Sequence, residues 1–304
     1  MTFGAELLRF PDLFPGRRGG EPWGERRVVL DVAGGPYRFE GLSDVQAEAV
    51  QARFGALCRE DGDAAVASRV FRAPAADFRE IDVRGWEYTL DLAPSPDSVL
   101  IAGLRLMARL DWTPDLAGGL WTPEAAGEEW TSVFENFLRI VTAYRLLAGG
   151  GVLLHSAGVT DGSGAFLLLG RSGAGKTTAS RLCLAGGGGV LSDDLNAVLF
   201  DAEGPRVASV PFTGDLGERG APPIVLPLRA VVRLVQGAEE GLRPLSPASA
   251  LGALMAGSPS VNRDPFRREA LFAVLDRLAR SAPAFEVTFS LGGGLWDILR
   301  RIPP

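Results

Sequence analysis

Lysine is almost missing from this chain of 304 residues, because Lys176 is the only lysine among 31 basic side chains. Acidic residues number 37, so the formal net charge is −6 and the pI is about 5.1. A chain with this balance has no positive field to hold a phosphate backbone, and we expect no nucleic-acid partner. Arginine supplies every other positive side chain, which makes the position of Lys176 informative.

Cysteine is scarce, histidine occurs once, and long hydrophobic runs are missing. Cys58 and Cys183 lie far apart and match neither metal-ligand nor redox spacing, so we expect two buried free thiols in a reducing compartment. The N-terminus shows no apolar signal segment, and no apolar run reaches the length of a membrane span. These features predict a cytoplasmic protein without a membrane partner.

The length allows two modest domains. Residues 1–148 are expected to form an α+β region, with short strands near 27–33 and 87–92 and a helix at 43–58. Its Trp and Phe side chains are expected to lie in the core. No catalytic constellation is visible in this region, so we assign it the recognition of a substrate or partner.

A clear amphipathic helix is predicted in residues 132–151, and the domain junction is placed at its end. Ser132 and Glu135 form a capping-box pattern at the start, and a glycine run stops the helix. Residues 149–304 then form the second domain. The predicted buried face of the helix carries Val133, Phe134, Phe137, Leu138, Val141 and Tyr144.

Two apolar strands follow the junction, at 151–159 and 165–170, and the short glycine-containing turn between them predicts a hairpin. The second strand runs directly into "GRSGAGKTT" (170–178), after which a helix is expected. A G-x-x-x-x-G-K-T motif between a strand and a helix is typical of a phosphate-binding loop.

The chemistry of this loop explains the retained lysine. The glycines permit a backbone nest of N–H groups, and Lys176 is expected against the β- and γ-phosphates of ATP, with the Thr177 hydroxyl on Mg²⁺. Arginine cannot replace Lys176, because a planar fork does not fit where a compact ammonium does. The predicted nucleotide-binding residues are Gly170, Ser172, Gly173, Ala174, Gly175, Lys176, Thr177 and Thr178.

The apolar run 189–201 carries two adjacent carboxylates, Asp193 and Asp194. In P-loop folds a strand beside the loop delivers an acidic residue near Mg²⁺. One carboxylate can hold the metal while the other accepts a proton, because neighbouring like charges separate their pKa values. His155 is either a core histidine or, as a hairpin neighbour of the loop strand, a side chain near the phosphates.

Three segments, "LLHSAGV" with His155, "GRSGAGKTT" and "LSDD", resemble in order and spacing the catalytic domain of HPr kinase/phosphorylase. That family shares a P-loop fold with phosphoenolpyruvate carboxykinase. The resemblance covers about residues 150–215 and extends more loosely to the end. It implies an α/β domain with a mixed sheet, an ATP-dependent kinase acting on a serine of a protein or peptide, and an oligomer.

The resemblance also implies roles for the side chains. Asp193 would activate the acceptor hydroxyl, while Asp194 and His155 would support the metal and the proton network. Arg171 and Thr178 stand where the HPr enzymes carry Asp and Glu, so the reverse phosphorylase reaction is not expected. The first domain does not resemble theirs, which favours a precursor peptide over HPr as acceptor.

Two other functions stay open. The chain is alternatively a regulatory module that binds ATP, or an NTPase without a protein acceptor. A carboxykinase is disfavoured because its metal site needs further Lys and His residues, and a switch GTPase is disfavoured because it needs a second lysine.

The remainder of the second domain is expected to complete a mixed sheet with helices on its faces. Residues 211–215 form a loop that either contacts nucleotide or substrate or is an ordinary turn. One of three arginines is expected to neutralise the transferred phosphate. The elements expected are strands at 228–237 and 284–291 and helices at 246–256 and 264–282, and the arginines are Arg219, Arg263 and Arg267.

Overall fold

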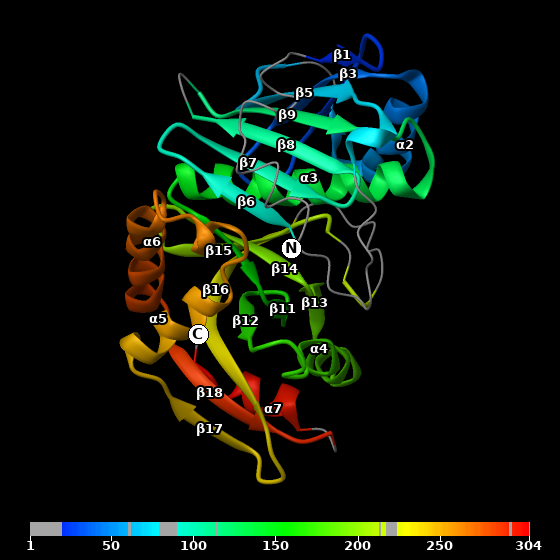
Figure 1. The fold of residues 1–304 in the computed structure, drawn as a ribbon. Coiled ribbons are helices and arrows are strands. Elements are labelled where there is room, and N and C mark those ends of the chain that lie inside the picture. Colours follow the sequence, from blue (N-terminus) through cyan, green and yellow to red (C-terminus); the bar gives the residue numbers. More distant parts are fainter. Residues whose placement is uncertain are drawn as a thin grey trace. The chain divides into compact units, whose positions relative to one another are not determined.

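The computed structural model describes residues 20–59, 62–78, 90–112, 115–212, 214–216, 224–291 and 294–303. Its contacts divide the chain into two units, Met1–Arg145 with Arg263–Phe266, and Leu146–Asn262 with Arg267–Pro304. Each unit is built on a nine-stranded mixed sheet with helices packed against it (Figure 1). The expected broad α/β class is therefore confirmed.

The sheet of the first unit runs β4-β2-β3-β5-β9-β8-β7-β6, and β1 pairs with β5. Strands β3, β5 and β9 are mutually parallel neighbours, whereas the other pairs are antiparallel. Its elements are β1 (Glu21–Pro22), β2 (Arg26–Leu30), β3 (Tyr37–Leu42), α2 (Asp44–Phe54), η3 (Gly55–Leu57), β4 (Cys58–Arg59), β5 (Val66–Arg72), η4 (Ala75–Asp77), β6 (Asp91–Pro94), β7 (Ser98–Gly103), β8 (Leu106–Asp111), β9 (Ala117–Thr122) and α3 (Gly127–Ala148).

Helices α2 and α3 supply the core of this unit. The predicted helix at 43–58 is confirmed as α2 and η3, and Ser43 caps α2 in a full capping box with Gln46. Phe134 of α3 is fully buried and meets Phe39 edge to face at 4.8 Å between ring centroids. The prediction of a core position is confirmed for the buried rings of this half, Phe39, Phe54, Trp121, Trp130, Phe134 and Phe137, whereas Trp23, Phe71, Phe78 and Trp112 are half-buried.

The start of α3 differs from the prediction. The helix begins at Gly127, so Ser132 lies in its second turn and the predicted cap at Ser132 and Glu135 is wrong. Glu128 and Glu129 extend the helix backwards and place negative charge in its first turn, where the helix dipole favours it. Glu135 instead accepts hydrogen bonds from two arginines, and the six predicted core residues of α3 are all buried.

The predicted strand at 27–33 corresponds to β2. Of the predicted strand 87–92, residues 87–89 lie outside the described residues, and the nearest described strand is β6. Cys183 is buried as predicted, whereas Cys58 is only partly buried, and both are free thiols.

The sheet of the second unit runs β10-β14-β15-β16-β12-β11-β13, and β18 joins β16 to β17. Strand β12, which leads into the glycine loop, lies parallel to β16, which lies parallel to β18. The elements are β10 (Val152–His155), β11 (Ala157–Thr160), β12 (Ala165–Leu169), α4 (Lys176–Ala185), β13 (Gly189–Ser192), β14 (Leu195–Phe200), β15 (Pro205–Ser209), β16 (Val225–Gln236), β17 (Gly241–Pro244), α5 (Pro247–Ala256), η5 (Val261–Arg263, its Arg263 in the first unit), α6 (Arg268–Ser281), β18 (Ala284–Phe289) and α7 (Leu295–Arg300).

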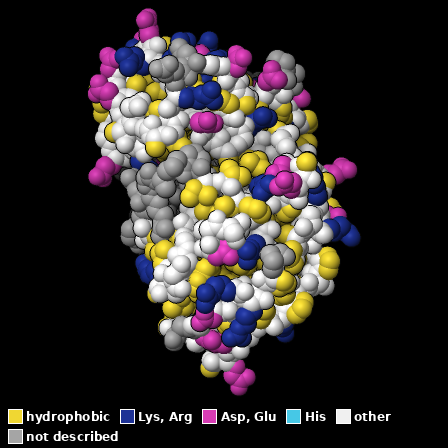
Figure 2. All heavy atoms as spheres, turned by 180° about the vertical axis from the view of Figure 1, so that it is seen from behind, with side chains coloured by type: hydrophobic (Ala, Val, Ile, Leu, Met, Phe, Trp, Pro, Cys, Tyr) yellow, Lys and Arg dark blue, Asp and Glu magenta, His cyan; other side chains and the backbone are white. Residues whose placement is uncertain are grey.

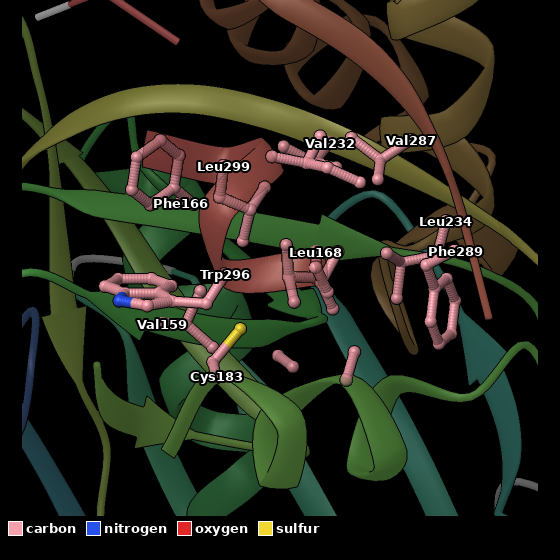
Figure 3. Packing of buried hydrophobic residues seen from close by; sticks show 14 of the residues in the cluster. Val159, Phe166, Leu168, Cys183, Val232, Leu234, Val287, Phe289, Trp296 and Leu299 are labelled. Atoms are coloured by element: carbon pink, nitrogen blue, oxygen red, sulfur yellow. The ribbon is translucent and has the colours of Figure 1, made fainter. Parts of the chain in front are cut away.

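A single apolar cluster fixes α4 and α7 on this sheet. Figure 3 shows Phe166 and Leu168 of β12 among side chains of β16, β18 and both helices. Cys183 of α4 and Trp296 of α7 lie in the same cluster. Helix α4, which follows the glycine loop, contacts β11, β13 and α7, so packing against these elements holds it in place.

The predicted strand 151–159 is divided in two. β10 ends at His155 and pairs with β14, whereas β11 begins at Ala157 and forms the predicted hairpin with β12. The break falls at Ser156, because the two halves join different partner strands. Downstream, the predicted strands and helices at 228–237, 246–256, 264–282 and 284–291 correspond to β16, α5, α6 and β18.

No helix within the described ranges combines the length and apolar character needed to cross a bilayer. Basic and acidic side chains are interspersed over the face drawn in Figure 2. Such mixing leaves no broad field of one sign on the described surface of that face.

Candidate functional site

The predicted phosphate loop lies between the fully buried strand β12 and the first turn of α4. Gly173 and Gly175 have φ of 77° and 90°, a left-handed conformation that favours glycine. At Gly170 a Cβ would lie 2.5 Å from Cβ of Ala174, so the loop closes tightly on itself. Left-handed residues within a loop turn successive backbone N–H groups toward one concavity, and such a concavity suits an anion.

The remaining loop residues line this turn without deep burial. Ser172 is exposed, and Ala174 donates its N–H to Arg171 O over 3.0 Å. Thr178 is half-buried in the first turn of α4, next to Thr177. Backbone and hydroxyl groups of the predicted nucleotide-binding residues are thus gathered at the start of one helix.

Lys176 is 8% exposed and folds back across the loop, where Nζ donates to Gly170 O over 3.0 Å. Burial lowers the pKa of Lys176, and the nearby charge of Asp194 opposes that shift. An ammonium held at the mouth of a glycine loop is placed for a phosphate oxygen.

Thr177 has a partner that the sequence analysis did not name. Its hydroxyl donates to Oδ2 of Asp215 over 3.2 Å. Asp215 lies at the end of the 211–215 loop, of which Thr213 is outside the described residues. The acidic residue in "PFTGD" was the available signal, but the approach of this loop to α4 depends on tertiary structure.

Asp193 follows β13 and is 6% exposed. Its Oδ2 accepts from the backbone N–H of Leu216 over 3.2 Å, and a Cβ at Gly214 would come within 2.2 Å of its Oδ1. The segment 214–216 therefore lies directly on this carboxylate. Only glycine at 214 permits the approach.

Asp194 and His155 lie in contact, with Nδ1 of His155 3.0 Å from Oδ1 of Asp194. His155 is half-exposed, so it is not the core histidine that was the alternative interpretation. With an N–H at Nδ1 facing the carboxylate, Nε2 is the nitrogen of the ring that can accept a hydrogen bond or a proton. Asp194 therefore lies close to both His155 and Lys176.

Two details of the predicted arrangement are wrong. His155 is not on the hairpin partner of the loop strand, because β10 pairs with β14. The strand β13 that leads to Asp193 pairs with β11 and not with β12. The sheet order therefore brings these residues together through β11 and β14, although each was expected on a direct neighbour of β12.

Two of the three candidate arginines, Arg263 and Arg267, lie in the described residues. Arg219 lies outside the described residues, and Arg263 belongs to the first unit, where Nη1 donates to Leu90 O over 3.4 Å. Arg267 precedes α6 as its N-cap residue. Which arginine contacts phosphate stays a prediction.

The oxygen donors present suit a magnesium ion that is held mainly by phosphate. Mg²⁺ characteristically binds one or two carboxylates beside phosphates and water. Thr177 and Asp194 are the predicted ligands, and Asp215 adds a carboxylate on the Thr177 hydroxyl. Within the described ranges, His, Cys, Asp and Glu form no group of three or more that would cage a metal ion.

Comparison of the chain with protein-family models and with curated proteins finds no match.

Proposed function

We propose that the second unit is a P-loop phosphotransferase of the HPr kinase type, which uses ATP and Mg²⁺ to phosphorylate a Ser or Thr hydroxyl of a protein or peptide. The observation that carries the proposal is the position of Asp194, which contacts His155 and interacts electrostatically with Lys176. The three segments that resemble that family thus meet at one place. Recognition of the acceptor falls to the first unit.

In this proposal the loop residues bind and orient the nucleotide. Lys176 exchanges its bond to Gly170 O for phosphate oxygens, and the N–H groups of 170–178 hold the same group from the backbone side. Thr177 and Asp194 would hold Mg²⁺, which would supply neutralisation of the phosphate charge. Binding energy is used mainly for positioning and charge neutralisation.

Asp193 acts as the proton acceptor. The acceptor hydroxyl gives its proton to the Asp193 carboxylate while its oxygen bonds to the γ-phosphorus, and the bond from that phosphorus to ADP breaks. The N–H of Leu216 donates to Oδ2 of Asp193 and so fixes the orientation of the whole carboxyl group. In this proposal Oδ1 takes the proton. His155 orients Asp194 through Nδ1.

The test is incubation of the purified chain with γ-labelled ATP, Mg²⁺ and lysate of its source cells, with ATP consumption followed in parallel. Wild type should label a protein or peptide, and Asp193→Asn should lose transfer by about 10²-fold or more while still binding nucleotide. Asp276→Asn is the matched control, because Asp276 pairs with exposed Arg280 on α6.

The outcomes separate the alternatives. Label transferred equally by Asp193→Asn would remove the proton-acceptor role from Asp193. ATP that stays bound and intact would indicate a regulatory binding module, and ATP that is consumed without a labelled acceptor would indicate an NTPase.

A further inference from the structure

Asn196 is a fully buried polar residue in β14 that the proposed chemistry does not use. Its Nδ2 donates to Ser156 O over 2.7 Å and to Ser156 Oγ over 3.2 Å. The orientation of the amide is fixed by chemistry, because a flipped amide would place its oxygen against the carbonyl oxygen of Ser156.

Ser156 is the residue at which the predicted single strand breaks. Its own N–H donates to Asp194 O over 3.0 Å, so the backbone of Ser156 is bonded on both sides to the segment 194–196. His155, immediately before it, donates its N–H to Gly257 O over 2.7 Å. These bonds set the direction in which the His155 side chain leaves β10.

The other end of the amide is held at a cost. Among the residues that the structure describes, no donor reaches the buried Asn196 Oδ1, an arrangement that lowers stability. It lies where a Cβ at Gly158 would come within 2.3 Å, so a side chain at 158 would displace it. An apolar residue of similar shape would avoid the orphaned oxygen but would also remove both bonds from Nδ2 to Ser156.

We propose that Asn196 is a positioning residue, which holds Ser156 and thereby sets the His155 ring against Asp194 in the phosphotransfer site. The proposal rests on the proposed function for its kinetic consequence, while its structural consequence is independent of any activity. Asn196 touches neither nucleotide nor acceptor in this scheme and acts through the strand break.

The main variant is Asn196→Leu, which keeps the branched shape, removes the donor and removes the orphaned oxygen. We expect a folded protein whose nucleotide Kd is unchanged within about twofold and whose kcat falls by about 10- to 100-fold, as for a misplaced catalytic group. A purely structural role would instead change the unfolding midpoint and leave kcat per folded molecule unchanged.

A second variant protects the test against misfolding. Gly158→Ala keeps Asn196 but pushes its amide away from Ser156. It should likewise lower kcat and leave the nucleotide Kd unchanged. Gly241→Ala is the matched control, because a Cβ there meets nothing within 4 Å and its φ is outside the left-handed region. Unchanged kcat in both folded Asn196→Leu and Gly158→Ala would overturn the proposal.

The activity-free readout uses the fact that His155 is the only histidine. In protein labelled with ¹⁵N-histidine, a single ring reports on the Nδ1 contact with Asp194. Both variants should move its ring nitrogen signals at one fixed pH, and Gly241→Ala should not. If wild type transfers no phosphate, the proposed function fails, and unchanged ring signals in the variants would overturn this inference separately.

Discussion

Gln46 in the first unit and Asp193 in the second are both buried polar side chains, yet their surroundings differ. Gln46 is neutral, and both ends of its amide bond to the backbone, at Ser43 N and Glu124 O. Asp193 is a carboxylate next to a second carboxylate, and it is held by a loop rather than by a cap. The Gln46 amide therefore links two backbone segments of the fold, whereas the Asp193 side chain lies beside a second acidic residue, at the place where the predicted phosphate site is built.

The contrast extends to the sheets that carry them. The first unit gathers aromatic side chains of α2, α3 and β3 into its core, and Phe134 is central to that packing. The second unit packs an aliphatic and aromatic core against α4 (Figure 3), and two of its buried ionisable groups, Lys176 and Asp193, follow the ends of β12 and β13. We therefore expect core changes in the first unit to alter stability, and changes at 170–196 to alter chemistry.

The largest expected effect is on stability in the first unit. Phe134→Ala should lower the free energy of unfolding by about 3–5 kcal/mol, because it removes a fully buried ring that contacts three others. Chemical denaturation measures this, with Phe266→Ala as the control, since Phe266 is 53% exposed. Equal losses in the two variants would contradict the assignment of Phe134 to the core.

Next is the effect of Lys176 on chemistry. Lys176→Met should lower kcat/KM by at least about 10²-fold, because it removes the cation aimed at the phosphates. Stability should hold or increase, since burial disfavours the charged ammonium and lowers its pKa. Kinetics and denaturation are measured on the same samples.

Lys176→Arg keeps the charge and serves as the comparison for that change. We expect it to recover little activity, because the planar guanidinium does not fit the loop. Full recovery would show that charge alone suffices, and the explanation for the retained lysine would be lost.

Glu286 on β18 is a second buried carboxylate of this unit, and we expect it to affect stability, whereas Asp193 is expected to affect chemistry. Burial alone would raise the pKa of Glu286, but bonds from Arg233 and Arg243 outweigh it and hold the pKa below the ordinary 4.5. A lowered folded-state pKa contributes stability above pH 4.5 that is lost as pH falls through the folded value.

Glu286→Gln should therefore cost about 1–2 kcal/mol of unfolding free energy near neutral pH, with no effect on kcat. The difference from wild type should shrink in acid, as urea unfolding at about pH 7 and about pH 3 would measure. Glu239→Gln is the control, because Glu239 is exposed. A difference that grows in acid would reverse the sign of this argument.

The smallest expected effect separates a real helix cap from a false one. Ser43→Ala should lower stability by about 1 kcal/mol, because Ser43 Oγ accepts the N–H of Gln46. Ser132→Ala should change stability by less than about 0.5 kcal/mol, since Ser132 is exposed within α3. A comparable loss at Ser132 would restore the cap first predicted there.

Several parts of the fold and of the site were predictable because they depend on neighbouring residues. Glycine spacing fixes the loop around Lys176, and apolar spacing fixes the buried face of α3. The break at Ser156 was not predictable, since an apolar run of this kind is typical of one continuous strand. The contact of Asp215 with Thr177 was also missed, because 38 residues separate them.

The local elements, the glycine loop with its single lysine and the adjacent carboxylates can all be read from the sequence, since each is set within one helix turn or one strand. The pairing of β10 with β14, the contact of His155 with Asp194 and the bonds of Asn196 to Ser156 arise only in the folded chain. The physical reason is that strand order and loop approach depend on contacts between distant residues, which leave no periodic trace in the chain.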